Sequence, residues 1–143
     1  MKIAEITTYK EGGAYTHVIE LVKGLKSETI IVTGNTKKEG FEKEDGNLFY
    51  HIPCVKSLWE VFFVNPTGSY RKVEKILEEN HVDIVHFHSP LFTFLHGFLK
   101  NKKIPCIMTC HYLLDIKANA ASSRIYSSFI KRMTKYIGKR VDK

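Results

Sequence analysis

Short apolar runs alternate along this chain with longer segments whose apolar residues recur at helical spacing, and no other feature of the sequence limits the fold as strongly. The short runs are rich in β-branched residues, which predicts strands over residues 2–7, 29–34, 48–53, 82–88 and 104–111. The longer segments predict helices over residues 14–27, 65–80, 91–101 and 122–143.

Strands that alternate with helices require crossover connections, and crossovers place neighbouring strands parallel to one another. The run "VDIVHFH" (82–88) is apolar over most of its length, as expected of a strand that is covered on both faces. The chain of 143 residues has about the length of one domain. We therefore expect a single Rossmann-like α/β domain with a mostly parallel sheet and helices on both faces. Residues 35–47, which are charged and poor in apolar side chains, are expected to form a solvated loop.

Composition bears on the cellular compartment. No apolar run reaches the about 18 to 20 residues that a membrane span needs, and the N-terminus lacks the charged and then apolar design of a signal peptide. The cysteines Cys54, Cys106 and Cys110 are odd in number and form no CxxC pair, which favours structural thiols over a disulfide or a zinc site. These features together predict a cytoplasmic protein.

Polar residues gather where three of the predicted strands end. The carboxyl ends of parallel strands meet at one edge of the sheet, and ligands of such sheets bind there. We therefore expect these side chains and glycines to line one common site. They are Gly12, Gly13, His86, His88, Ser89, Thr109, His111 and Asp115.

The glycine pair Gly12–Gly13 precedes a predicted helix. Glycine lets backbone N–H groups approach a ligand closely, and a helix N-terminus favours negative charge, so the pair suits a diphosphate. A plain turn is the alternative interpretation. The pattern is not GxGxxG, so dinucleotide binding is not implied. His17 lies near the start of the same helix, where it either reaches this site or faces solvent.

His86 and His88 are two residues apart on a strand and so point to the same face. Their role stays open between a metal site with His111 and Asp115, histidines of the core or of the site wall, and direct ligand contact. Their spacing matches no known metal pattern, and no metal is expected. His111 is suited to exchange a proton or a hydrogen bond near neutral pH. Ser89 is either a helix cap or a ligand contact.

Three motifs, "GGAYTHVIELVKGL" (12–25), "DIVHFHSP" (83–90) and "IPCIMTCHYLLD" (104–115), occur in the order and spacing of a known family. Together they resemble the N-terminal domain of family 4 glycosyltransferases, which are retaining enzymes that use nucleotide sugars. The resemblance implies the GT-B arrangement, in which two Rossmann-like domains enclose the reaction cleft. It further implies a hexosyltransferase type of activity with no cofactor.

The resemblance also implies roles for single residues. Gly12 and Gly13 would approach the donor diphosphate, and His111 would be the catalytic residue near the transferred sugar or the acceptor. His88 and Ser89 would line the acceptor side. The full set of expected substrate-binding residues is Gly12, Gly13, His17, His88, Ser89, Thr109 and Asp115.

The sequence departs from the family pattern in its extent. It contains no second domain, which in this family carries the acidic motif of two glutamates eight residues apart, and the strand expected after "VDK" (141–143) is missing. Residues 1–143 are therefore expected to be the N-terminal, acceptor-side domain only, a fragment that lacks its last strand and the C-terminal donor domain and is inactive by itself. The alternative is a non-catalytic Rossmann-type domain that binds an anion or another ligand, or acts as a scaffold.

The excess of 22 basic over 15 acidic residues gives a net charge of +7, which favours an anionic partner. Besides a nucleotide-sugar donor, the expected partner is a sugar or lipid-linked acceptor. The predicted helix 122–143 carries a basic face that suits peripheral contact with an anionic membrane, at its inner face, although an ordinary surface helix has the same pattern. The aromatic segment 55–64 is either core or an apolar lip for the acceptor. No nucleic acid is expected, because nothing resembles a recognition module.

Overall fold

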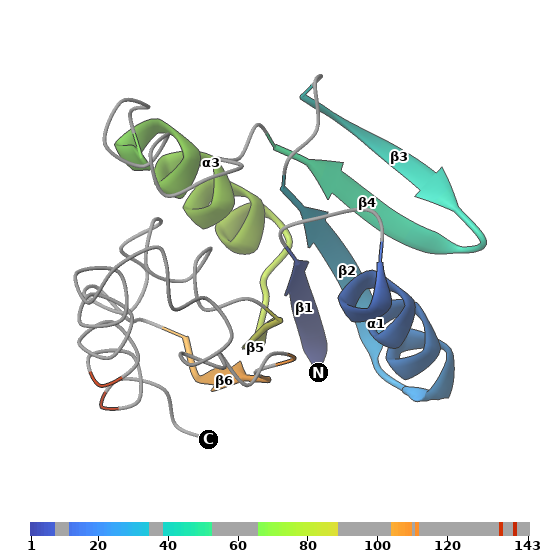
Figure 1. The fold of residues 1–143 in the computed structure, drawn as a ribbon. Helices are drawn as coiled ribbons and strands as arrows, with labels where there is room; N and C mark the ends of the chain where they lie inside the picture. Colours follow the sequence, from blue (N-terminus) through green and yellow to red (C-terminus); the bar gives the residue numbers. More distant parts are fainter. Residues whose placement is uncertain are drawn as a thin grey trace, which may run out of the picture.

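The computed structural model describes residues 1–7, 12–34, 39–52, 66–88, 104–109, 111, 135 and 139. The predicted helix 91–101 and the aromatic segment 55–64 lie outside these residues, as does the predicted helix 122–143 apart from two positions. The described elements are β1 (Lys2–Thr7), α1 (Gly13–Gly24), β2 (Glu28–Thr33), β3 (Gly40–Glu44), β4 (Asn47–His51), α3 (Pro66–Glu79), β5 (Ile84–Phe87) and β6 (Cys106–Met108) (Figure 1).

The strands form one sheet in the order β3-β4-β2-β1-β5-β6. Every pair of neighbours is parallel except β3 and β4, which are antiparallel. On one side of the central strand β1 lie β2, then β4, then β3 at the edge, and after these strands the chain crosses to the other side of β1 to form β5 and β6. The boundary between β1 and β5 is thus the topological switch point of the sheet, the place at which ligands of such folds bind.

Alternate residues of the strands enter two separate cores on opposite faces of the sheet. Ile30 and Val32 of β2 pack with Val73 and Leu77 of α3, whereas Ile31 between them packs with residues of α1. Side chains of a strand point to opposite faces in turn, so α1 and α3 cover opposite faces. The expectation of a mostly parallel, Rossmann-like sheet with helices on both faces is confirmed by this arrangement.

The expectation of a solvated loop over residues 35–47 is wrong for the part that the structure describes. Residues 40–44 form β3, and the turn at Asp45–Gly46 joins β3 to β4 as a hairpin. Both turn residues have positive φ, 49° for Asp45 and 81° for Gly46, which is the requirement of a tight two-residue hairpin turn. All five residues of β3 are exposed, so the strand carries no apolar alternation that would have predicted it.

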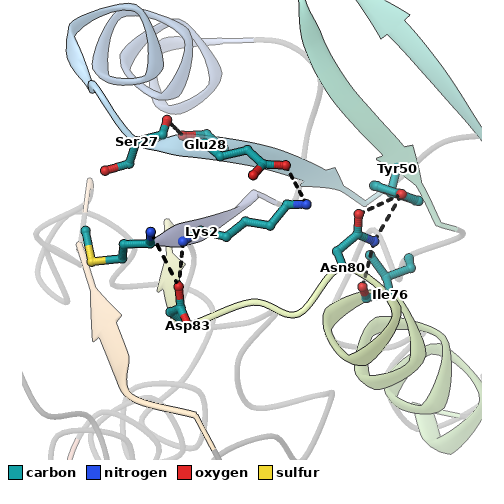
Figure 2. A network of polar contacts seen from close by, with 9 residues as sticks. Lys2, Ser27, Glu28, Tyr50, Ile76, Asn80 and Asp83 are labelled. Carbon is teal, nitrogen blue, oxygen red and sulfur yellow. Dashed lines mark hydrogen bonds and ion pairs between the residues drawn. The ribbon is translucent and has the colours of Figure 1, made fainter.

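Contacts at the amino ends of the strands hold β1, β2 and β5 in register (Figure 2). The backbone N–H of Lys2 donates to Asp83 Oδ2 at 2.7 Å, and Lys2 Nζ forms an ion pair with Glu28 Oε1 at 2.6 Å. Because the amino ends are aligned in this way, the carboxyl ends of the same strands also finish level with one another.

Asn80, just after α3, donates hydrogen bonds to the carbonyl of Ile76 at 2.8 Å and to the hydroxyl of Tyr50 at 3.0 Å.

Among the described helices, none combines the length and the apolar character that crossing a membrane requires.

Candidate functional site

The side chains that form the site share one face of the sheet because of strand periodicity. Glu5 of β1 and His86 of β5 are register partners across the switch point. Their chain neighbours Ala4, Val85 and Phe87 lie in the core on the α3 side, so Glu5 and His86 point toward the α1 side. The same alternation carries His88, Thr109 and His111 to that side.

Glu5 is a carboxylate buried within the sheet, with 1% of its surface exposed. Its Oε2 atom lies 2.9 Å from His86 Nδ1 and 2.6 Å from His88 Nε2. Burial, the largest single influence, raises the pKa of Glu5, but hydrogen bonds and charge interactions with His86 and His88 together outweigh it and lower the pKa. Glu5 is therefore ionised at neutral pH and accepts a hydrogen bond from each imidazole.

The ionised carboxylate determines which nitrogen of His88 carries the proton. A carboxylate only accepts hydrogen bonds, so His88 Nε2 must be the donor toward Glu5. Burial lowers the pKa of His88 against the opposing effect of its hydrogen bond to Glu5, and the ring is neutral near pH 7. In the neutral ring Nδ1 is an acceptor, and it lies 3.0 Å from His111 Nε2. His111 Nε2–H therefore donates to His88.

His111 stands at the outer end of this chain of contacts and is partly exposed. Partial burial and the neighbouring imidazoles of His88 and His17 lower its pKa, so the ring is neutral near pH 7. His17 of α1 meets it edge-on, with ring centroids 4.9 Å apart. The helix that begins at Gly13 thus brings His17 to the same edge of the sheet as His111.

A second branch runs from Glu5 through His86. His86 Nε2 lies 2.8 Å from Thr109 Oγ1, and the backbone N–H of Thr109 donates to the carbonyl of Phe87 at 2.8 Å. His86 Nδ1 donates to Glu5, and the other ring nitrogen, Nε2, forms the hydrogen bond with the Thr109 hydroxyl. Thr109, His86, Glu5, His88 and His111 consequently form one continuous network.

Gly12 has φ 84° and ψ 177°, a conformation that is essentially limited to glycine. A Cβ atom built on Gly12 or Gly13 would meet nothing within 4 Å among the described residues. No side-chain hydrogen bond caps α1 within that part of the chain, so its first backbone N–H groups are not occupied by a capping side chain. Both glycines lie within two turns of His17 on the same helix end.

The structure thus brings together His17, His88, Thr109 and His111 from the predicted set, with Gly12 and Gly13 at the start of α1. Ser89 and Asp115 lie outside the described residues. Two members of the network were not assigned a role from sequence, His86 and Glu5. The signal for Glu5 is that it is the one acidic residue of the strand "KIAEIT", and its significance follows only from its register with His86.

A mostly parallel sheet with a polar cluster at its switch point and a glycine-led helix beside it is an α/β domain of the Rossmann-like type. The family model described as Glycosyltransferase Family 4 matches residues 11–143, and the chain belongs to that family.

A solved sucrose-phosphate synthase from Thermosynechococcus elongatus has a similar fold, with a TM-score of 0.74 and 15% sequence identity. The match covers 99% of this chain and 41% of the synthase chain, so these residues span less than half the length of that protein. A comparison with curated protein sequences found no match.

The histidine network predicts a dependence of stability on pH. The folded state keeps the pKa of His88 and His111 below the ordinary 6.5, so the unfolded chain takes up protons first as the pH falls. The free energy of unfolding should therefore decrease as the pH falls from about 7.5 to 5.5, by at most about 1.4 kcal/mol per pH unit for each proton.

Urea unfolding of His88→Gln should show a shallower slope of unfolding free energy against pH in this range. His81→Asn, an exposed turn residue with φ 51°, should keep the slope of the parent chain, and an equal slope in His88→Gln would contradict the assignment.

The conformation of Gly12 predicts opposite effects for two glycine substitutions at the two ends of α1. Gly12→Ala should lower the free energy of unfolding by about 1–3 kcal/mol, because its backbone region excludes side chains. Gly24→Ala, at the last turn of α1 and with open space for a Cβ, should raise it by about 0.4–1 kcal/mol. Thermal and urea unfolding of both variants measures the difference, and equal effects would show that Gly12 is not held in this conformation.

Proposed function

We propose that this protein is the acceptor-side domain of a retaining glycosyltransferase, which transfers a sugar from a nucleotide-sugar donor to a sugar or lipid-linked acceptor. The observation that carries the proposal is the network from buried Glu5 through His88 to His111. It orients one partly exposed imidazole at the switch point, beside the glycine-led start of α1.

The donor diphosphate is proposed to lie against the start of α1. Uncapped backbone N–H groups and the positive end of the helix dipole favour a phosphate there. Gly12 and Gly13 have no side chains, so a diphosphate can approach the backbone closely, and the open space around both supports this role. A net charge of +7 for the chain adds a general attraction for the anion.

His111 is proposed to accept a hydrogen bond from a hydroxyl of the transferred sugar. Its Nε2–H is engaged by His88 Nδ1 at 3.0 Å, which leaves Nδ1 of the neutral ring with a free lone pair. A neutral acceptor whose tautomer is fixed by a buried network orients the sugar without reorganisation during the reaction. Thr109, Ser89 and Asp115 are proposed to line the adjoining acceptor side.

The proposal includes a division of labour between two domains. Residues 1–143 supply the acceptor side, and a second α/β domain of the kind found in GT-B enzymes supplies the nucleotide pocket. The coverage of 41% of the sucrose-phosphate synthase chain agrees with a match to one part of a larger enzyme. The rival function is a non-catalytic ligand-binding or scaffold domain, and a scaffold has no need of a partly exposed imidazole fixed by a buried carboxylate.

The direct test is sugar transfer by the full-length protein, followed as release of nucleoside diphosphate from a panel of nucleotide sugars. His111→Ala should lower kcat by about 100-fold with a smaller change in KM, since the sugar loses the group that orients it. His81→Asn, at the opposite edge of the sheet, should leave both constants unchanged. Undiminished transfer by His111→Ala would contradict the role of this residue.

Residues 1–143 alone should show no turnover. Adding a donor domain from a family member should leave the fold of this chain unchanged, as judged by circular dichroism. Turnover by the isolated chain would contradict the two-domain proposal but would leave the role of His111 testable.

We also propose that residues 122–143 contact an anionic membrane surface at its inner face, which would bring the domain to lipid-linked acceptors. Support comes from the basic composition of this segment, which holds Arg124, Lys131, Arg132, Lys135 and Lys139. Flotation with vesicles should recover the chain when they contain anionic lipid and not when they are neutral. Replacing Lys135 and Lys139 by Gln should weaken the recovery of the chain with anionic vesicles, whereas Lys75→Gln on α3 should not. Recovery that is independent of lipid charge would contradict the proposal.

A further inference from the structure

We infer that His17, His88 and His111 form a binding site for one transition-metal ion, with Zn²⁺ the best match. Each imidazole offers one ligand nitrogen, and these three atoms lie within 4.8 Å of one another. The three residues come from α1, from the end of β5 and from the segment after β6, so the site links three separate parts of the chain. It does not depend on sugar transfer and is not part of the function proposed above.

The spacing of the nitrogens suits tetrahedral coordination. Zn–N bonds of about 2.0–2.1 Å place two ligands of a tetrahedron about 3.4 Å apart. His88 Nδ1 and His111 Nε2 are 3.0 Å apart, so this pair needs to separate by only a few tenths of an ångström. His17 is exposed on α1 and its ring already lies 4.9 Å from that of His111, so a side-chain rotation closes the remaining distance.

Glu5 prepares His88 as a ligand. Its carboxylate holds His88 Nε2 at 2.6 Å, which directs the lone pair of Nδ1 toward His17 and His111. A carboxylate behind a histidine in this way fixes the tautomer of the ligand and raises its basicity at metal sites. Its negative charge also partly balances the charge of the ion. His111 binds through Nε2 once its proton moves from Nε2 to Nδ1, so no proton is lost from that ring.

A second group, Glu5, His86 and His88, also places its ligand atoms within 4.8 Å. Here the same Oε2 atom of Glu5 already accepts from both imidazoles, and Glu5 and His88 are each 1% exposed. This group is closed to an ion from solvent and serves as the support behind the outer site. The exposed His17 and the partly exposed His111 provide the route of entry.

Three imidazoles without a thiolate define the class of metal. Imidazole ligands favour Zn²⁺, Co²⁺, Ni²⁺ and Cu²⁺, whereas Mg²⁺ and Ca²⁺ prefer oxygen ligands. Three protein ligands leave one position of a tetrahedron for water or for an oxygen of a bound anion.

The experiment is titration of the chelator-treated chain with Co²⁺, followed by its visible absorption, and with Zn²⁺ in competition with a chromophoric chelator. The expected result is one equivalent bound, with the strong visible bands of tetrahedral Co²⁺. His17→Ala and His111→Ala should each remove the one-equivalent binding. Glu5→Gln should weaken it by about 10- to 100-fold, the effect typical of a lost supporting carboxylate. His81→Asn is the matched control and should bind as the parent chain does.

His17 is exposed, so its replacement leaves the fold intact and keeps the test valid even where Glu5→Gln fails to fold by circular dichroism. Absence of one-equivalent Co²⁺ or Zn²⁺ binding by the parent chain would overturn the inference. Unchanged affinity in His17→Ala would overturn the ligand set, and displacement of bound Co²⁺ by excess Mg²⁺ would overturn the choice of metal class.

Discussion

The carboxylate of Glu5, buried between two imidazoles, is the interaction on which the site depends. A charge inside a sheet is strongly unfavourable unless donors surround it. His86 and His88 supply those donors at 2.9 and 2.6 Å, and in return each ring is fixed in one orientation. The second ring nitrogen of His86 contacts Thr109, and that of His88 contacts His111. Removing the charge would release both branches of the network at once.

The position of this interaction in the sheet explains why it can serve a ligand. β1 and β5 are adjacent, but the chain leaves them toward opposite sides of the sheet. Connections that diverge in this way leave the strand ends between them accessible. Glu5 and His86 are register partners across that boundary. Among the described residues, the first ones after the two strands are Gly12, the N-cap of α1, and His88. A polar network elsewhere in the sheet would lie beneath a crossover connection.

Much of the fold was predictable because apolar periodicity is a local property of the sequence. It placed β1, β2, β4, β5, β6 and both described helices, and it predicted that His86 and His88 share a face. β3 was not predicted because its five residues are all exposed and show no apolar alternation, although Asp45–Gly46 is a sequence typical of a hairpin turn. The role of Glu5 was missed for a different reason. Its meaning depends on register with a strand about 80 residues away, and register is a tertiary property.

His111 is the one member of the network whose proton has two useful positions. With the proton on Nε2, the ring donates to His88 and its Nδ1 lone pair is free for a sugar hydroxyl. With the proton on Nδ1, the Nε2 lone pair faces His88 and His17 and suits a metal ion. Glu5 holds His88 in the same tautomer in both cases. The two proposed uses of the site therefore differ by a single proton on a single ring, and one excludes the other, so metal occupancy and sugar contact must compete.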